Sequence, residues 1–144
     1  MADFGDPSKR ILFIDDDQAL QNLVVMMLQR VGLQTWVADT AVEGLEMMRT
    51  EDFGLLILDL MLPDIDGFEV LSRLRKNTRY EKMPILILSA RAETEAISRG
   101  FELGADGYLT KPYLPNSLIE RVRTLLSQGR RRTGSGDQAA RPDA

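Results

Sequence analysis

The sequence predicts an α/β protein, a single domain built around a doubly wound parallel sheet of five βα units with strand order 2-1-3-4-5. Short apolar runs alternate with amphipathic stretches along the chain, which is the pattern of repeated strand–helix units. Most of these runs are apolar at consecutive positions, as is typical of strands that helices cover on both faces. The length of 144 residues suits one domain with a hydrophobic core.

The first half of the chain contains three expected strands and two expected helices. The strands are residues 11–14, 34–38 and 55–58. The second of them is more polar, as suits the edge of a sheet. Asp17 is a good N-cap for the first helix. Its apolar residues recur at helical spacing: Leu20, Leu23, Val24, Met27, Leu28 and Val31. Thr40 and Glu43 form a capping box for a helix that ends at Arg49.

The second half contains two further strands and three helices. The strands are residues 85–88 and 107–110. Asp66 and Glu69 have the spacing of another cap, for a helix through Leu74. A helix over 93–103 is expected to turn three residues inward: Ala96, Ile97 and Phe101. Pro115 suits the first position of the last helix, 115–128. Its inward residues are Leu118, Ile119, Val122, Leu125 and Leu126.

The domain is expected to span residues 9–128. Residues 1–8 form a short polar N-terminal extension. Residues 129–144 contain a Gly-Ser-Gly segment at 134–136 and almost no large apolar side chain, so we expect a disordered tail or linker. The net charge of −4 is uneven, because six arginines and three acidic residues from Glu120 onward leave −7 on residues 1–119. An acidic body argues against nucleic acid as the ligand of this domain.

Composition excludes several classes of chemistry. The chain has no cysteine, hence no disulfide and no thiolate metal site, and no histidine, hence no serine–histidine catalysis and no phosphohistidine of its own. It has no apolar stretch of about 18 residues and no signal peptide. We therefore expect a cytoplasmic protein with no membrane contact.

The chemistry-bearing residues follow the strands. In an open parallel sheet the ligand crevice lies beyond the carboxyl ends of the strands, and strands one and three are neighbours at the switch point. Asp15, Asp16 and Asp59 should therefore meet. Such a cluster is tolerated if a hard cation is bound, and Mg²⁺ fits because only oxygen ligands are present. Ser89 and Lys111, at the next two strand ends, would complete a cradle for a phosphoryl group, with the Asp59 carboxylate as nucleophile.

Other interpretations of these residues are weaker. Acidic residues after strands are often solvated caps, and this is the favoured interpretation of Asp17. The run Asp64–Gly67 suggests an EF-hand loop, but Leu62 and Arg73 stand where its first and last ligands belong. A flavodoxin-like cofactor binder shares the expected fold, yet an acidic crevice disfavours a flavin phosphate.

Four segments carry a family resemblance over about residues 9–128. They are Ile-Leu-Phe-Ile-Asp-Asp-Asp at 11–17, Leu-Asp-Leu-Met-Leu-Pro-Asp-Ile-Asp-Gly at 58–67, Pro-Ile-Leu-Ile-Leu-Ser-Ala at 84–90 and Gly-Ala-Asp-Gly-Tyr-Leu-Thr-Lys-Pro at 104–112. With them the sequence resembles the receiver domains of two-component response regulators, of the CheY-like type. The resemblance implies a flavodoxin-like fold and a phosphorylation-dependent signalling switch that assists its own phosphorylation and dephosphorylation, rather than a turnover enzyme.

The resemblance also implies roles for individual residues. Asp59 is the phosphoacceptor, and Mg²⁺, with Mn²⁺ as the alternative ion, is bound by Asp16 directly, by Asp15 through water, by Asp59 and by the backbone carbonyl of Met61. Lys111, whose bond to Pro112 is often cis in this family, binds a phosphoryl oxygen. Ser89 and Tyr108 form the switch: Ser89 moves to the phosphoryl group and Tyr108 turns inward, which alters a surface built from helix 93–103, strand 107–110 and helix 115–128.

The implied partners are proteins. The phosphoryl donor is a phosphohistidine on a sensor histidine kinase or on a histidine phosphotransfer protein. The output is either a separate protein bound by a stand-alone receiver or an output domain fused behind the linker, and a phosphorylation-dependent homodimer is a further option. The arginines at 130–132 fit a solvated linker better than a nucleic-acid contact.

Overall fold

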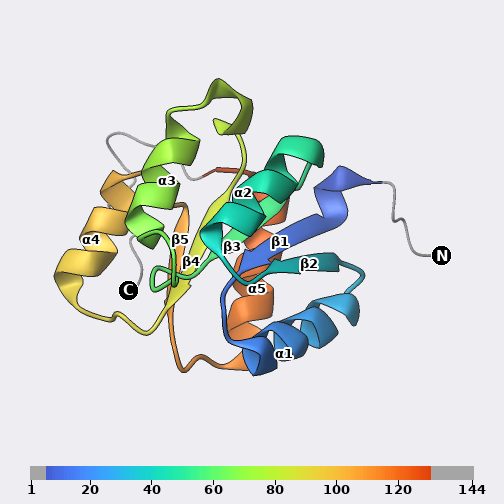
Figure 1. The fold of residues 1–144 in the computed structure, drawn as a ribbon. Helices are drawn as coiled ribbons and strands as arrows, with labels where there is room; N and C mark the ends of the chain where they lie inside the picture. The colour runs from blue at the N-terminus through green and yellow to red at the C-terminus, as the bar shows by residue number, and fades with distance from the viewer. Residues whose placement is uncertain (1–5, 131–144) are drawn as a thin grey trace.

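A computed structural model describes residues 6–130. Its centre is a five-stranded parallel sheet in the order β2-β1-β3-β4-β5 (Figure 1). The strands are β1 (Arg10–Ile14), β2 (Gln34–Ala38), β3 (Leu55–Leu58), β4 (Ile85–Ser89) and β5 (Gly107–Thr110). The helices are α1 (Gln18–Gln29), α2 (Ala41–Thr50), α3 (Gly67–Arg75), α4 (Thr94–Glu102) and α5 (Pro115–Gln128), with short 3₁₀ helices η1 (Pro7–Lys9) and η2 (Thr78–Tyr80). The predicted fold class and strand order are confirmed. Within the described residues, none of the helices combines the length and apolar character needed to cross a bilayer.

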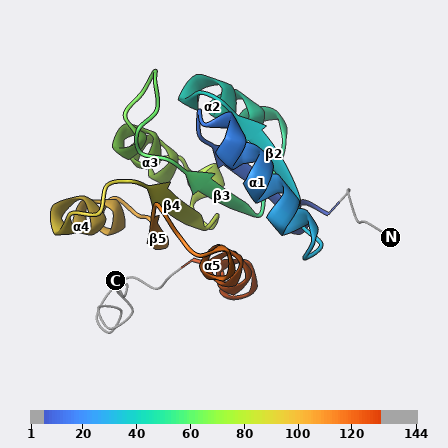
Figure 2. The same ribbon diagram turned by 90° about the horizontal axis from the view of Figure 1, so that it is seen from below.

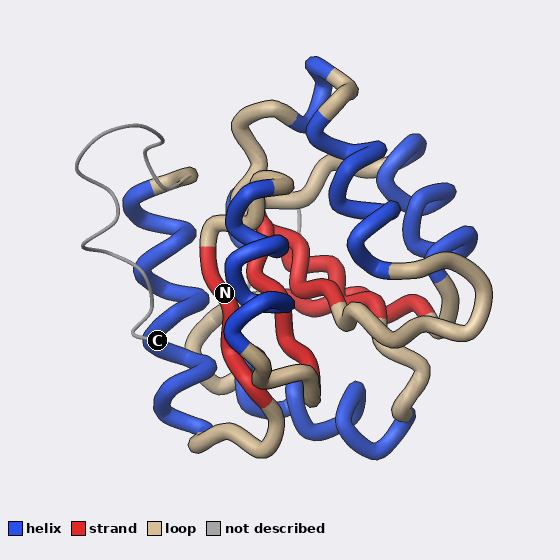
Figure 3. The backbone as a smooth tube through the Cα atoms, turned by 90° about the vertical axis from the view of Figure 1, so that its left-hand side faces the viewer, coloured by secondary structure: helices blue, strands red, loops and turns tan. Residues whose placement is uncertain are grey.

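Helices cover both faces of the sheet. Alternate residues of each strand point to opposite faces, so the sheet builds two hydrophobic cores. Leu12 and Ile14 of β1 pack in the core formed with α2, α3 and α4. Ile11 and Phe13 pack in the core formed with α1 and α5. Figure 2 shows α3 and α4 on the opposite side of the sheet from α5, and Figure 3 shows the strands enclosed by helices. This arrangement explains why the strands are apolar at consecutive positions.

The helix starts are close to those predicted, but their hydrogen bonds differ in detail. Asp17 accepts from the Leu20 amide (3.1 Å) and Thr40 accepts from the Glu43 amide (3.1 Å), as expected of N-caps. In a capping box the Glu43 carboxylate would accept from the Thr40 amide. In the structure it accepts from the amide one residue earlier, that of Asp39 (2.8 Å), so this part of the prediction is wrong. Asp64 takes over part of this role: its two carboxylate oxygens accept from the first two amides of α2.

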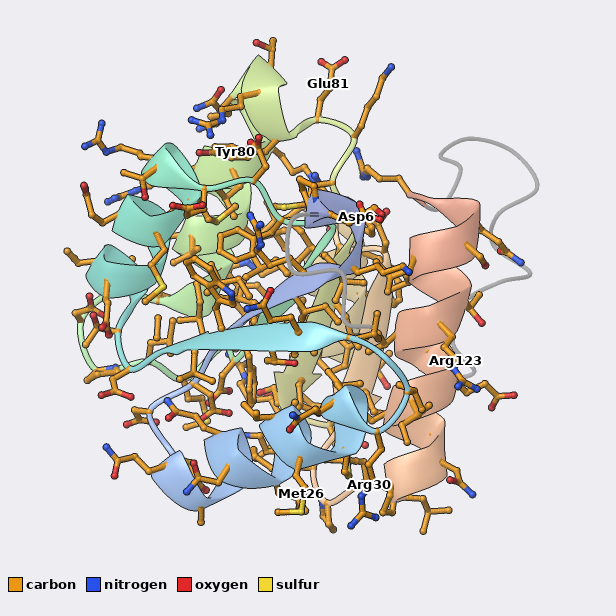
Figure 4. The ribbon with its side chains drawn as sticks, turned by 90° about the vertical axis from the view of Figure 1, so that its right-hand side faces the viewer. Asp6, Met26, Arg30, Tyr80, Glu81 and Arg123 are labelled. Carbon is orange, nitrogen blue, oxygen red and sulfur yellow. The ribbon has the colours of Figure 1, made fainter. Side chains whose placement is uncertain are left out.

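Helix α1 turns a slightly different face inward than its apolar pattern predicts. Leu23, expected at an inward position, is 46% exposed, whereas Gln21 is buried. Gln21, Val24 and Leu28 share the stripe that faces the sheet, because they are spaced three and four residues apart. Met26 also points away from the sheet (Figure 4). A polar side chain can occupy this stripe because its hydrogen bonds are satisfied.

The ends of the predicted domain lie partly outside the described residues. Most of the predicted tail or linker, residues 131–144, and most of the predicted N-terminal extension belong to that part. Arg130, which the sequence assigns to the tail, contacts the body instead. Its guanidinium donates to the Asp106 carboxylate (3.0 Å) and to the carbonyls of Glu81 and Gly104.

Candidate functional site

Three carboxylates meet at the carboxyl ends of β1 and β3. Asp15 and Asp16 follow β1, Asp59 follows β3, and an oxygen atom from each lies within 4.8 Å of the others. The sheet itself sets this distance, because Ile14 and Leu58 are paired in register and the Asp59 amide donates to the Ile14 carbonyl (3.0 Å). Asp15 and Asp59 are buried and Asp16 is exposed. The convergence predicted from the strand ends is therefore found in the structure.

Lys111 brings a positive charge to this cluster from the end of β5. Its Nζ donates to Asp15 Oδ2 (2.8 Å) and to Asp59 Oδ2 (3.4 Å). The Lys111 amide donates to the Ser89 carbonyl (2.8 Å), which fixes the chain directly after β5. The bond between Lys111 and Pro112 is cis. Burial alone would lower the pKa of Lys111, but the hydrogen bond to Asp15 and the charges of Asp59 and Asp15 raise it, so the ammonium stays charged.

The charged form of Asp59 is destabilised in the folded protein. Burial, and then the negative charge of Asp15, raise its pKa above the ordinary value. The Met61 amide, which donates to Asp59 Oδ1 (3.2 Å), and Lys111 offset only part of this effect. The metal-free site therefore holds more negative charge than its own donors neutralise.

Ser89 and Tyr108 are joined through the backbone of Arg91. The Arg91 amide donates to Ser89 Oγ (3.2 Å), and the Tyr108 hydroxyl donates to the Arg91 carbonyl (2.7 Å). Tyr108 is buried, with only 4% of its surface exposed. Gly100 of α4 makes room for it, since a Cβ there would lie 3.3 Å from the ring.

The comparisons with known proteins agree with this geometry. The family model described as the response regulator receiver domain matches residues 11–123. The chain belongs to this family. Response regulator receivers are signalling switches of two-component systems, so the predicted functional class is confirmed at this level.

Two curated relatives and one solved structure illustrate the similarity of the receiver to known proteins. The DNA-binding dual master transcriptional regulator RpaA of Synechocystis sp. is 41% identical over 132 residues, covering 92% of this chain and 53% of RpaA. The cell cycle response regulator CtrA of Brucella ovis is 37% identical over 121 residues, covering 84% of this chain and 51% of CtrA. The chain thus spans about half the length of these relatives. The CheY-like receiver domain protein of Methanospirillum hungatei superposes with a TM-score of 0.78 at 33% identity, covering 83% of this chain and 94% of that one.

The donor set of the receiver fits a hard divalent cation. All the ligand atoms that the acidic cluster offers are carboxylate oxygens, which suit Mg²⁺ better than soft metals. One ammonium stands against three carboxylates, and the pKa of Asp59 is raised first by burial and then by the charge of Asp15. Met61 lies two residues beyond Asp59 and its amide donates to Asp59 Oδ1 (3.2 Å), so its backbone borders the cluster. An acidic site that can hold a metal ion is therefore present where the sequence predicted it.

In metal-free protein, Asp59→Asn is expected to raise the free energy of unfolding near neutral pH, because ionised Asp59 is costly in the folded state. Below the ordinary value of 3.8, Asp59 carries its proton in both states and this cost is absent. As the pH rises through the raised pKa of the folded state, the wild type loses this stability and the advantage of the variant grows. Urea denaturation in EDTA, from just below the ordinary value of 3.8 up to neutral pH, measures the difference. If the difference in free energy of unfolding between Asp59→Asn and the wild type became smaller with rising pH, the assignment of the pKa shift to Asp59 would be contradicted.

Sequence reasoning missed several residues that hold the site in place. Gln21 bonds the Asp15 backbone, Asp64 bonds the start of α2, and Arg91 joins Ser89 to Tyr108. Gly67 is a fourth, because its backbone packs directly on the Asp59–Leu60 backbone. Burial of Gln21 could have been suspected from its place on the inward stripe of α1. The other three depend on contacts that no local pattern reveals.

Proposed function

We propose that Asp59 accepts a phosphoryl group from a phosphohistidine of a sensor histidine kinase or a histidine phosphotransfer protein, and that the modified receiver signals to an output. The observation that carries the proposal is the meeting of Asp15, Asp16 and Asp59 within 4.8 Å, beside the ammonium of Lys111. Of the three carboxylates, Asp59 is the one that accepts both from the Met61 amide and from Lys111, and its pKa is raised. These contacts support Asp59 as the nucleophile.

The transfer joins an Asp59 carboxylate oxygen to phosphorus while the bond between phosphorus and the imidazole nitrogen of the donor breaks. The electron pair of that bond stays on the imidazole. Lys111 would exchange one of its carboxylate partners for a phosphoryl oxygen, and the Ser89 hydroxyl would donate to another. Mg²⁺, held by Asp16, by Asp59, by the Met61 carbonyl and through water by Asp15, would neutralise the charge that gathers on these oxygens. Water attack on the same phosphorus would break its bond to the Asp59 oxygen, release inorganic phosphate and return Asp59 to its carboxylate form.

The switch would run through Arg91. Its amide donates to Ser89 Oγ and its carbonyl accepts from Tyr108, so the backbone of one residue contacts both side chains. When the phosphoryl group recruits Ser89, this amide loses or changes its acceptor and the loop between β4 and α4 settles differently. Phosphorylation would thereby shift the population of arrangements of α4, β5 and α5.

The output is proposed to lie outside this domain. The curated relatives are about twice as long as the matched region, and one is named as a DNA-binding transcriptional regulator. A fused output domain or a separate partner would read the α4-β5-α5 surface, alone or in a phosphorylation-dependent homodimer. The receiver itself, with its acidic body, would bind neither nucleic acid nor membrane and would act in the cytoplasm.

Beryllofluoride, which mimics a phosphoryl group on a carboxylate, tests the proposal. With Mg²⁺ it is expected to raise the thermal unfolding midpoint of the wild type, because it binds only the folded state. It is also expected to shift the NMR signals of the backbone amides around Ser89 and Tyr108. Asp59→Asn should show neither change. Asp52→Asn is the control and should respond like the wild type, because Asp52 is an exposed carboxylate near the amino ends of the strands, away from the acidic cluster. An equal response from Asp59→Asn would refute the assignment of the phosphoacceptor.

A further inference from the structure

Gln21 is a buried polar side chain on the face of α1 that packs against the sheet. It is 5% exposed. Its amide nitrogen donates to the backbone carbonyl of Asp15, at the end of β1, and to Asp39 Oδ1 (2.7 Å), directly after β2. One side chain therefore ties a helix to two strand ends at the acidic edge of the sheet.

The chemistry of its partners suits a side chain with two hydrogen-bond donors. A carbonyl and a carboxylate are both acceptors, so they need a group with two donors between them, and the glutamine NH₂ supplies both. An apolar side chain would leave the Asp15 carbonyl without this bond, and burying an unpaired carbonyl is unfavourable. A carboxylate would add a charge that two acceptors repel.

Gln21 completes the set of bonds that fixes Asp15. The Asp15 amide donates to the Ala38 carbonyl (3.0 Å), Asp15 Oδ1 accepts from the Asp17 amide (2.9 Å), and Asp15 Oδ2 accepts from Lys111. Gln21 holds the remaining polar atom, the carbonyl oxygen. This carbonyl belongs to the peptide that joins Asp15 to Asp16. Because Asp16 is exposed, the direction of its side chain depends on how that peptide is oriented.

We propose that Gln21 is a positioning residue that sets the Mg²⁺ affinity of the receiver by holding the Asp15–Asp16 peptide in place. The inference rests on the proposed function, since it assumes that these aspartates bind the ion. Partners that orient metal ligands typically change metal affinity about 10-fold to 100-fold when they are removed. Gln21 acts on the ligands through the backbone and need not touch the ion.

The test compares Gln21→Met, similar in length but without a donor, with Gln29→Met on the exposed side of the same helix. Calorimetric titration with Mg²⁺, well below the unfolding temperature, gives the dissociation constant, and thermal unfolding in EDTA gives the metal-free stability. We expect Gln21→Met to raise the dissociation constant about tenfold or more, and Gln29→Met to leave it unchanged. Asp39→Asn, which keeps an oxygen acceptor for Gln21, should also bind Mg²⁺ like the wild type.

The outcomes separate this inference from the proposed function. If Gln21→Met lowers only the metal-free stability and keeps the wild-type dissociation constant, Gln21 is purely structural and the inference is wrong. If the wild type itself does not bind Mg²⁺, the proposed function fails and this inference fails with it. Should Gln21→Met not fold, Gln21→Asn is measured in its place. Its shorter side chain cannot reach both acceptors, so wild-type affinity in that variant would equally overturn the proposal.

Discussion

Replacing Asp106 with alanine is expected to lower the free energy of unfolding by about 3–5 kcal/mol. The Asp106 side chain, directly before β5, is completely buried. Its Oδ2 accepts from Arg75 (2.8 Å) and from the Ile85 amide (2.9 Å), and its Oδ1 accepts from Arg130 (3.0 Å). Alanine would leave the Arg75 guanidinium, only 10% exposed, without its counter-charge. Urea denaturation of the metal-free protein measures the loss.

The electrostatics of Arg75 explain why this effect is large. Burial lowers the pKa of Arg75 to about 10, even though the charge of Asp106 acts in the opposite direction. The guanidinium is thus already costly to keep charged while its partner is present. Without Asp106, the nearby Arg130 would add only repulsion.

An exposed ion pair of similar composition is the control for Asp106. Asp52 pairs with Arg79 at 3.3 Å, and both side chains are largely in solvent. Asp52→Ala should change the free energy of unfolding by at most about 1 kcal/mol. Because Asp106 lies at the amino ends of β4 and β5, the folded Asp106→Ala variant should keep its response to Mg²⁺ and beryllofluoride. A loss of stability no larger than that of Asp52→Ala would show that the buried network is not a major source of stability.

The sequence predicts the acidic site well because the fold converts strand ends into neighbours. Asp15 and Asp59 are far apart in the chain, yet each directly follows a run of buried strand residues. Once the strand order is inferred from the alternation of strands and helices, the position of both carboxylates follows from topology alone. Asp17 is predictable for a different reason, because N-capping is a local interaction within one turn.

The contacts that the sequence does not predict join polar groups across long separations. Asp106 bonds Arg75 and Arg130, which are 31 and 24 residues away. Periodicity states which face of a helix turns inward but not whether a polar residue on that face will find a partner there. Gln21 does find one, and Leu23, its apolar neighbour in sequence, is left in solvent. Such pairings are decided by tertiary packing, which a local pattern does not contain.

Gly67→Ala is expected to displace the loop that carries Asp59 and so to damage stability and the site together. A Cβ on Gly67 would lie 2.4 Å from Leu60 Cα and 2.8 Å from the Asp59 carbonyl oxygen. These are backbone atoms, so no side-chain rotation relieves the clash, and the Gly67 amide also donates to the Leu60 carbonyl (2.9 Å). We expect a loss of about 1–3 kcal/mol of unfolding free energy, as for other overpacked positions. Denaturation together with Mg²⁺ and beryllofluoride titration measures both effects.

Gly107→Ala separates the clash at Gly67 from the general effect of removing a glycine. There the added Cβ would meet side-chain atoms, Leu86 Cδ1 at 3.0 Å and Leu125 Cδ1 at 3.6 Å, which can move by rotation. We expect Gly107→Ala to cost less stability than Gly67→Ala. It should bind Mg²⁺ like the wild type, because Gly107 lies at the amino end of β5, whereas the acidic cluster lies at the carboxyl ends of the strands. If Gly67→Ala loses stability but binds Mg²⁺ and beryllofluoride normally, the loop can absorb the shift without moving Asp59. The close packing of Gly67 on the Asp59–Leu60 backbone would then serve folding alone.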